Sequence, residues 1–429
     1  MRDHQRFEKD ILPNGITLYS YRDRFRTVNL DVLFPVGAAH SHPSNGFIPG
    51  SAHFLEHIQL IRSSAFPEPY QLDRELGLLG GHSDGTTYPC WTEHWIDAPV
   101  QQTDFATRAF VDRVFHPVFQ EGDFATERTV IMNERNQRKF YPGRSASSQY
   151  FYTQFLNDTS YPIEQMFGSD DDLASTHATD LQAMHGKMTA SEETVAIAVG
   201  SEDFSELKKA LSEIPTDGPV FTAKMEPTTW AERSYKTAFF ETISQPTLKV
   251  AWLHPRATYE EAEGLSFIIS LLINTTHGPL YEEFREERGW VYGLEGFCSQ
   301  RENNLLLGLT FPVNQAEQVQ FIRECLLDRI RVAVFDQDLV EHEIMRCMHN
   351  QVYNYQTAGE IISSASRDLM TYGRTYSEKE WMLAIKKMVD PAWRIGLWER
   401  YFKESEMGEV CFMPERRKLV PERMGKKIE

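Results

Sequence analysis

The sequence lacks both an excess of positive charge and a long apolar run. It carries 44 Lys and Arg against 62 Asp and Glu, a formal net charge of −18. Phosphate backbones and anionic lipids repel such a chain, so we expect neither nucleic acid nor a membrane as partner. The longest strongly apolar run, from Leu265 to Ile273, is too short to span a bilayer.

Paired cysteines and a signal sequence are also missing. The five cysteines are odd in number and form no C-x-x-C pair, which favours a reducing compartment. The first ten residues contain no apolar core of the kind that a signal peptide requires. We therefore expect a cytoplasmic protein.

What the chain does contain is enough apolar material for more than one core. Its 429 residues are 41% hydrophobic and 12% aromatic, and the length favours about two or three domains. The apolar periods predict helices over 70–79, 105–118, 124–140, 179–188, 204–214, part of 260–288, 315–334 and 339–355. They predict strands over 28–36, 86–97, 194–199, 247–253, two within 290–312, and 410–413.

The second half repeats the order of elements of the first, and turn-forming residues 215–229 separate the two. We therefore predict an α/β (α+β) protein of two similar domains, related by duplication. Each would be a mostly antiparallel sheet covered by helices. The first domain would span 1–222 and the second, which has no metal motif, 223–429.

The stretch His53-Phe54-Leu55-Glu56-His57 is an H-x-x-E-H pattern in an apolar segment, with Ser51 as a candidate helix cap. On a helix, both histidines and Glu56 share one side. Two imidazoles, an open position for water and a nearby carboxylate are what a catalytic zinc site needs, with Glu56 as general base. A chance pair of surface histidines is the alternative.

A hydrolytic zinc site usually has a third protein ligand. Glu127 and Glu134 lie seven residues apart, on one face of a predicted helix, and Glu134 is the better candidate. One carboxylate could bind zinc while the other orients a histidine ligand. The alternative is that both are solvated surface acids.

H-x-x-E-H followed by a helical E-x6-E resembles the pitrilysin/insulysin family of inverted-motif zinc peptidases. The opening Leu12-Pro-Asn-Gly-Ile and the Gly80-Gly81 turn agree with this family, and in length the chain is similar to its half-size branch. The resemblance implies that His53, His57 and Glu134 bind Zn²⁺. It also implies that Glu56 is the general base and Glu127 the supporting acid.

The resemblance further implies a substrate-binding pair, Arg285 and Tyr292, in the second domain. A guanidinium and a phenol can donate hydrogen bonds to substrate carbonyls and to a developing oxyanion. The alternative is a charged helix end followed by a core tyrosine. The chain departs from the family after the Gly-Gly turn, where relatives usually show Asn-Ala and this chain has His82-Ser83-Asp84-Gly85-Thr86. Substrate could still add there as a strand, and Asp84 could favour a basic or amino-terminal group.

These features predict a zinc metalloendopeptidase that hydrolyses peptides or extended polypeptide segments in a closed chamber. The resemblance implies a dimer, either a homodimer or a heterodimer with a related subunit. Two alternatives remain open: a non-catalytic peptide-binding scaffold of the same fold, and a dedicated precursor-processing protease that works with a sister subunit.

Overall fold

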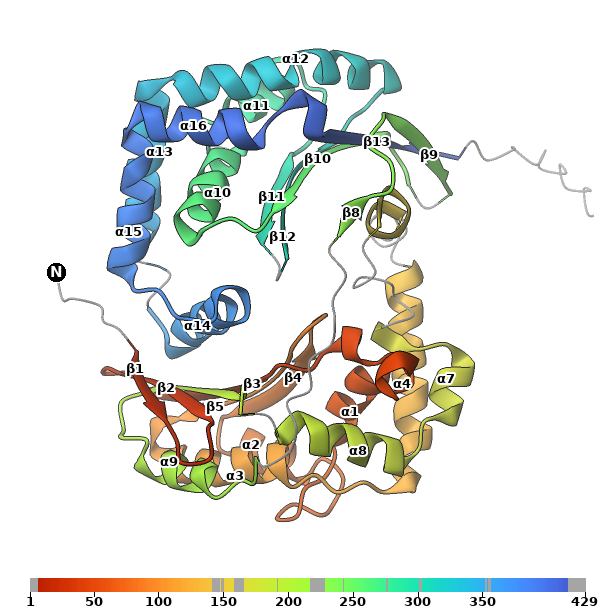
Figure 1. The fold of residues 1–429 in the computed structure, drawn as a ribbon, viewed down its shortest axis with the longest axis vertical. Helices are drawn as coiled ribbons and strands as arrows, with labels where there is room; N and C mark the ends of the chain where they lie inside the picture. Colours follow the sequence, from red (N-terminus) through yellow and green to blue (C-terminus); the bar gives the residue numbers. More distant parts are fainter. Residues whose placement is uncertain are drawn as a thin grey trace, which may run out of the picture.

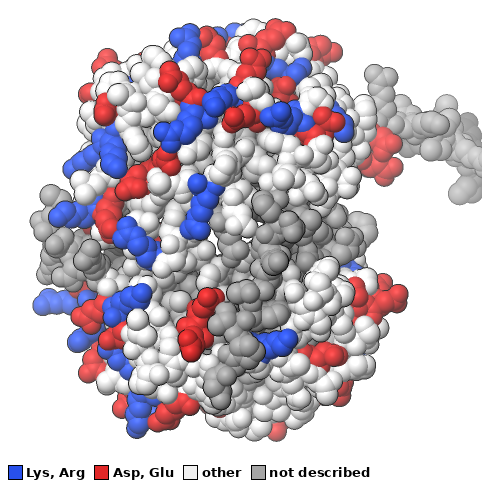
Figure 2. Space-filling model, in the orientation of Figure 1, with Lys and Arg blue, Asp and Glu red and all other residues white. Residues whose placement is uncertain are grey.

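Two β-sheets, one from each half of the chain, carry the fold (Figure 1). The computed structural model describes residues 7–140, 147, 150–157, 166–190, 192–216, 228–241, 243–274, 277–300, 303–351, 353 and 356–415. No helix among these residues is long and apolar enough to cross a membrane. Figure 2, in the orientation of Figure 1, shows basic and acidic side chains intermingled over the upper lobe, which contains the second sheet.

The first sheet has the strand order β1-β2-β7-β3-β5-β4. Its strands are β1 (Glu8–Ile11), β2 (Thr17–Arg22), β3 (Thr27–Phe34), β4 (His82–Thr87), β5 (Thr92–Pro99) and β7 (Val195–Gly200). Only the β2–β7 pair is parallel among these described strands. Central strand β3 is buried on both faces, which explains its near-continuous apolar sequence. Strand β4 lies at the edge.

The second sheet, β11-β12-β10-β13-β9, repeats this arrangement. Its strands are β9 (Lys236–Phe240), β10 (Thr247–Pro255), β11 (Glu295–Gln300), β12 (Asn304–Pro312) and β13 (Met407–Pro414). Again the pair β9–β13 is parallel and the other described pairs are antiparallel. Strands β2, β7, β3, β5 and β4 thus correspond in order to β9, β13, β10, β12 and β11. The predicted mixed fold of two similar, mostly antiparallel domains is confirmed.

Helices cover both sheets. In the first half they are α1 (Ser51–Gln59), α2 (Gln71–Leu78), α3 (Thr103–Phe115), α4 (Glu121–Phe140), α7 (Asp170–Ser175), α8 (Ala178–Thr189) and α9 (Ser205–Ser212). In the second they are α10 (Tyr259–Ile273), α11 (Pro279–Tyr281), α12 (Ala316–Phe335), α13 (Gln337–Asn350), α14 (Ala358–Tyr372), α15 (Glu378–Lys386) and α16 (Pro391–Tyr401).

One sequence prediction about these elements was wrong, and one region was missed. The strand expected over 86–97 is a hairpin, because β4 and β5 pair antiparallel on either side of a turn at 88–91. The polar, Gly-containing sequence of β4 gives no strand alternation that could have marked it. Residues 358–401 form three helices, α14, α15 and α16, where no element was predicted.

Each half also contributes one element to the other half's sheet. Helix α14 packs on β3 and β7 of the first sheet (Figure 1), where the Ser366 hydroxyl donates a hydrogen bond to Asp31 Oδ2 at 2.8 Å. In the other direction, the helical turn η4 (Phe151–Phe155) packs on Val410 and Phe412 of β13. The boundary predicted between residues 222 and 223 lies outside the described residues and stays a prediction.

Candidate metal centre

Helix α1 brings His53 and His57 onto one face, with ring centroids 4.7 Å apart. The helix begins after Gly50, whose φ of 86° is left-handed and whose Cβ, if present, would meet the backbone of Gly168 and Phe167 at 2.7 Å. The expected Ser51 cap is wrong. The Ser51 hydroxyl instead donates to Ile48 O, and the Ser41 hydroxyl accepts the hydrogen bond from the Ala52 amide.

The third member of the group, Glu134, reaches the histidines from α4. Its Oε2 lies 3.5 Å from the Nε2 atoms of both His53 and His57. Ligands about 2.0–2.1 Å from a tetrahedral metal are separated by about 3.4 Å, so this spacing fits a shared ion. Among the residues that the structure describes, this is the one group of three potential ligand side chains whose atoms all lie within 4.8 Å.

Glu127, two helical turns earlier on α4, contacts the other nitrogen of His57. Its Oε2 lies 3.0 Å from His57 Nδ1, and its Oε1 accepts a hydrogen bond of 2.7 Å from the Tyr70 hydroxyl. A proton held on Nδ1 by a carboxylate leaves Nε2 unprotonated and oriented, as ligand histidines require. The geometry therefore separates the two carboxylates: Glu134 faces both Nε2 atoms and Glu127 faces one Nδ1.

Glu56 lies buried between α1 and edge strand β4. Its Oε2 accepts a hydrogen bond of 2.8 Å from the Thr87 hydroxyl. A Cβ on Gly85 would lie 2.7 Å from Glu56 Cγ, so any larger residue would displace this side chain from its present position. Burial raises the pKa of Glu56 to about 7, against the lowering effects of His57 and Thr87. A carboxyl group with such a pKa can both accept and release a proton near neutrality.

The carboxylates of Glu56, Glu127 and Glu134 stabilise positive charge at His57. Burial lowers the pKa of His57, but hydrogen bonds to Glu127 and Glu134 and the charge of Glu56 outweigh burial and raise it to about 9. For Glu127, burial alone would raise the pKa of the carboxyl group. The hydrogen bonds from His57 and Tyr70 outweigh the effect of burial, so the pKa of Glu127 is lowered. Two imidazoles and a carboxylate in such surroundings suit a divalent cation such as Zn²⁺.

Asp84 is on the opposite face of β4 from Glu56. Ser83 and Thr87 bond to residues of the helical layer, Asp73 and Glu56, so alternation turns Asp84 the other way, where it is exposed. Its Oδ1 accepts a hydrogen bond from the Gly85 amide. Because β4 is an edge strand, one side of its backbone faces no other described strand.

The structure brings Arg285 and Tyr292 together in the segment that follows α11, which lies in the other lobe from α1 (Figure 1). Arg285 Nε donates to Tyr292 O at 2.7 Å, and its guanidinium lies 5.5 Å from the Tyr292 ring centroid and pairs with Glu286. Tyr292 is 87% exposed, so it is not the core tyrosine of the alternative interpretation.

Sequence reasoning missed two residues that complete the site, Tyr70 and Thr87. Each donates its hydroxyl to one of the site's carboxylates, Glu127 or Glu56. Tyr70 lies 57 positions from its partner and Thr87 lies 31 from its own, and neither belongs to a local motif. No pattern in a single sequence could have connected them.

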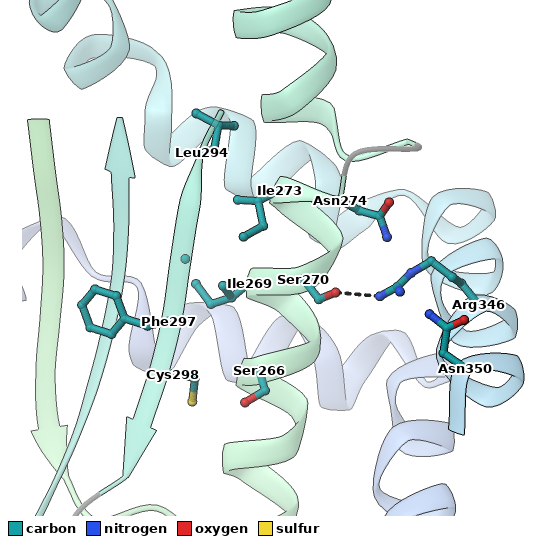
Figure 3. Close-up of a pocket in the computed structure, with 11 residues that line it drawn as sticks. Ser266, Ile269, Ser270, Ile273, Asn274, Leu294, Phe297, Cys298, Arg346 and Asn350 are labelled. Atoms are coloured by element: carbon teal, nitrogen blue, oxygen red, sulfur yellow. Dashed lines mark hydrogen bonds between the residues drawn. The ribbon is translucent and has the colours of Figure 1, made fainter. Parts of the chain in front are cut away.

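A pocket in the second half is lined by elements that follow one another in the same order as those of this centre (Figure 3). Helix α10, edge strand β11 and α13 occupy the places of α1, β4 and α4 and line a pocket of about 760 Å³. Ser266 and Ser270 take the spacing of the two histidines. The Ser270 hydroxyl donates to Glu343 Oε1 at 2.7 Å, as His57 pairs with Glu127, and Asn350 stands seven residues after Glu343.

Comparison with known proteins shows family similarity over both halves. Residues 17–163 match the model "Insulinase (Peptidase family M16)", and residues 176–344 match "Peptidase M16 inactive domain". An uncharacterized zinc protease of Bacillus subtilis, YmxG, is 21% identical over 309 residues, which cover 71% of this chain and 73% of the relative.

Solved structures share the fold over nearly the whole chain. The crystal structure of a protease from Helicobacter pylori has a TM-score of 0.80 at 16% identity, covering 95% of this chain and 99% of that one. A structure titled as a peptidase M16 inactive domain, from Pseudomonas fluorescens, has a TM-score of 0.78 at 16% identity, covering 96% and 98%. At this identity the likeness concerns the fold alone.

Proposed function

We propose a function from the premise that this chain belongs to peptidase family M16, the insulinase family. The protein is a zinc-dependent endopeptidase that acts on peptides or extended polypeptide segments. The observation that carries the proposal is the convergence of His53 Nε2, His57 Nε2 and Glu134 Oε2, with Glu56 on the same helix. In this proposal the three converging atoms are the zinc ligands.

Bound zinc would lower the pKa of a water molecule and polarise a peptide carbonyl. Glu56, as general base, accepts a proton from the attacking water and delivers it to the leaving amine. Thr87 and the space left by Gly85 hold the Glu56 carboxyl group in place. Glu127 supports the centre by holding the proton on His57 Nδ1.

Substrate would bind to the free edge of β4 as an additional strand, where main-chain hydrogen bonds give affinity without a fixed sequence. Exposed Asp84, on the face away from Glu56, would favour a basic group or an amino terminus in the substrate. Unchanged cut sites for Asp84→Asn would contradict this role. Arg285 and the exposed Tyr292 would contact the substrate from the second half once a chamber closes.

The assembly that we propose is a homodimer, since the metal group and the Arg285–Tyr292 pair occur in one chain. A heterodimer with a related subunit is the other arrangement. A non-catalytic scaffold is the rival function, favoured by the similarity of residues 176–344 to an inactive domain. The converging ligand set in the first half favours catalysis over that rival.

Digestion of a mixed peptide library by zinc-loaded protein, read by mass spectrometry, tests the function. Wild type should cleave, and Glu56→Gln should be slower by at least about a hundredfold because it removes the general base. Both should bind one zinc per chain, because Glu56 is not a ligand in this proposal. Zinc binding without cleavage would favour the scaffold, and equal cleavage by both proteins would exclude Glu56 as the base.

A further inference from the structure

Tyr70 has a backbone conformation that its side chain does not favour. Its φ of 53° and ψ of 26° are left-handed, and it is the one non-glycine residue with positive φ in the part of the chain that the structure describes. Such a conformation is unfavourable for a bulky side chain and persists where surrounding contacts enforce it. A bulky aromatic residue held there points to a role for its side chain.

The contacts that enforce it belong to the loop 60–70, which joins α1 to α2. The Tyr70 amide donates to Ile61 O at 2.8 Å and closes the loop on itself. Arg62, near the start of the loop, forms an ion pair of 2.8 Å with Asp123 in the first turn of α4, and both side chains are largely buried. The loop is therefore fastened to α4 as well as to α1.

Tyr70 makes the second attachment, one helical turn further along α4. Asp123 and Glu127 are four residues apart and share a helical face, so the loop contacts two successive turns through Arg62 and Tyr70. Glu127 is 4% exposed and uses each oxygen once: Oε1 for the Tyr70 hydroxyl and Oε2 for His57 Nδ1. Tyr70 of the loop therefore contacts Glu127, and Glu127 contacts His57, a proposed ligand.

The geometry points to Tyr70 as a positioning residue of the metal centre, which acts through Glu127 to orient His57. The inference rests on the proposed zinc function. With the hydroxyl present, the Glu127 carboxylate has one orientation that satisfies both of its oxygens. Without it, one buried oxygen loses its donor and the carboxylate can turn away from His57. The imidazole is then held less firmly toward the ion.

The test is titration of metal-free, full-length protein with Co²⁺, followed by its visible absorption bands. Tyr70→Phe keeps the ring and removes only the hydroxyl. Loss of a partner behind a ligand histidine costs about 10- to 100-fold in metal affinity, and for Tyr70, one bond further out, we expect about tenfold. The absorption bands should also shift, because they report the arrangement of ligands around the ion.

Tyr88→Phe is the matched control. Its hydroxyl likewise donates to a glutamate, Glu93 Oε2 at 3.0 Å, but that pair makes no contact with the proposed ligands. It should leave Co²⁺ affinity and spectrum at wild-type values, which separates the positioning effect from general loss of a Tyr–Glu hydrogen bond. If Tyr70→Phe does not fold, Asp123→Asn, which loosens the same loop from α4, must change affinity and spectrum in the same direction.

The outcomes separate this inference from the function on which it rests. Wild-type affinity and spectrum in Tyr70→Phe would overturn the inference alone, since the centre would then exist without needing the hydroxyl. Absence of Co²⁺ binding by the wild type would overturn the proposed metal centre and the inference together.

Discussion

Gly85 and Glu56 illustrate how closely this centre is packed at the level of single residues. The Cβ that Gly85 lacks would approach Glu56 Cγ to 2.7 Å and His94 Nδ1 to 3.1 Å. Since Glu56 and His94 are both buried, neither can turn into solvent to make room. The glycine is therefore required by its neighbours and not by its own backbone conformation.

We predict that Gly85→Ala slows peptide hydrolysis by about a hundredfold, because displacing the Glu56 carboxyl group by a fraction of an ångström misaligns the general base. Metal affinity should stay near the wild-type value, since the proposed ligands come from α1 and α4. Peptide cleavage rates and zinc titration measure the two properties separately.

Gly77→Ala provides the control for that substitution. Gly77 lies within α2, and a Cβ there would meet nothing within 4 Å. We expect unchanged hydrolysis and a stability gain of about 0.5–1 kcal/mol from better helix propensity. A wild-type hydrolysis rate in Gly85→Ala would contradict the proposed packing of Glu56.

Helix α14 shows how one element joins the two halves. It comes from the second half of the chain, yet it covers the face of the first sheet that carries Tyr19, Leu33 and Ile197. The contact includes the buried carboxyl group of Asp31, which accepts the Ser366 hydroxyl. Burial raises the pKa of Asp31 well above its usual range, and the nearby Glu93 raises it further.

A raised pKa for a buried acid means that the folded state keeps a proton that the unfolded state releases. Stability should therefore fall as the pH rises above about 4, the unfolded pKa of an aspartate, and level off once folded Asp31 ionises. We predict that Asp31→Asn removes this part of the pH dependence. It should exceed wild type by about 1–3 kcal/mol at pH 8, with an advantage that shrinks toward pH 4.

Urea unfolding at several pH values measures this effect. Asp104→Asn, at an exposed position of α3, is the control for loss of a carboxyl group at the surface. If Asp31→Asn and wild type lost stability in parallel between pH 4 and pH 8, the buried contact of α14 with Asp31 would not be the source.

The two proposed functional groups lie apart at the scale of the whole molecule. The proposed metal ligands belong to α1 and α4, whereas Arg285 and Tyr292 follow α11, a helix of the other lobe (Figure 1). In a symmetric dimer, the pair from one protomer could serve the centre of the other. Whether the groups act within one chain or between two has a clear kinetic signature.

We predict that mixing two inactive variants, Glu56→Gln and Arg285→Ala, restores hydrolysis to about a quarter of the wild-type rate. With random exchange half of the dimers are mixed, and each mixed dimer has one intact site formed from both chains. The peptide cleavage rate after subunit exchange measures this. Absence of recovery, with mixed dimers verified by mass, would show that each chain uses its own Arg285, whereas absence of any dimer would contradict the proposed assembly.

The sequence by itself determined what depends on local geometry. His53, Glu56 and His57 lie within two turns of one helix, so their common face follows from the helical period alone. The same period placed Glu127 and Glu134 on one side of α4. The repeated order of elements could be predicted because helices and strands each have a local apolar period. The matching topology of the two sheets supports the duplication.

Only the tertiary structure decided how these local pieces meet. It set Glu134 Oε2 3.5 Å from both histidine Nε2 atoms and turned Glu127 to His57 Nδ1, which a spacing of seven residues cannot distinguish. It brought Tyr70 and Thr87 to the centre and carried α14 across to the first sheet. Such contacts join residues distant in the chain, so packing between elements, rather than the preference of any one segment, determines them.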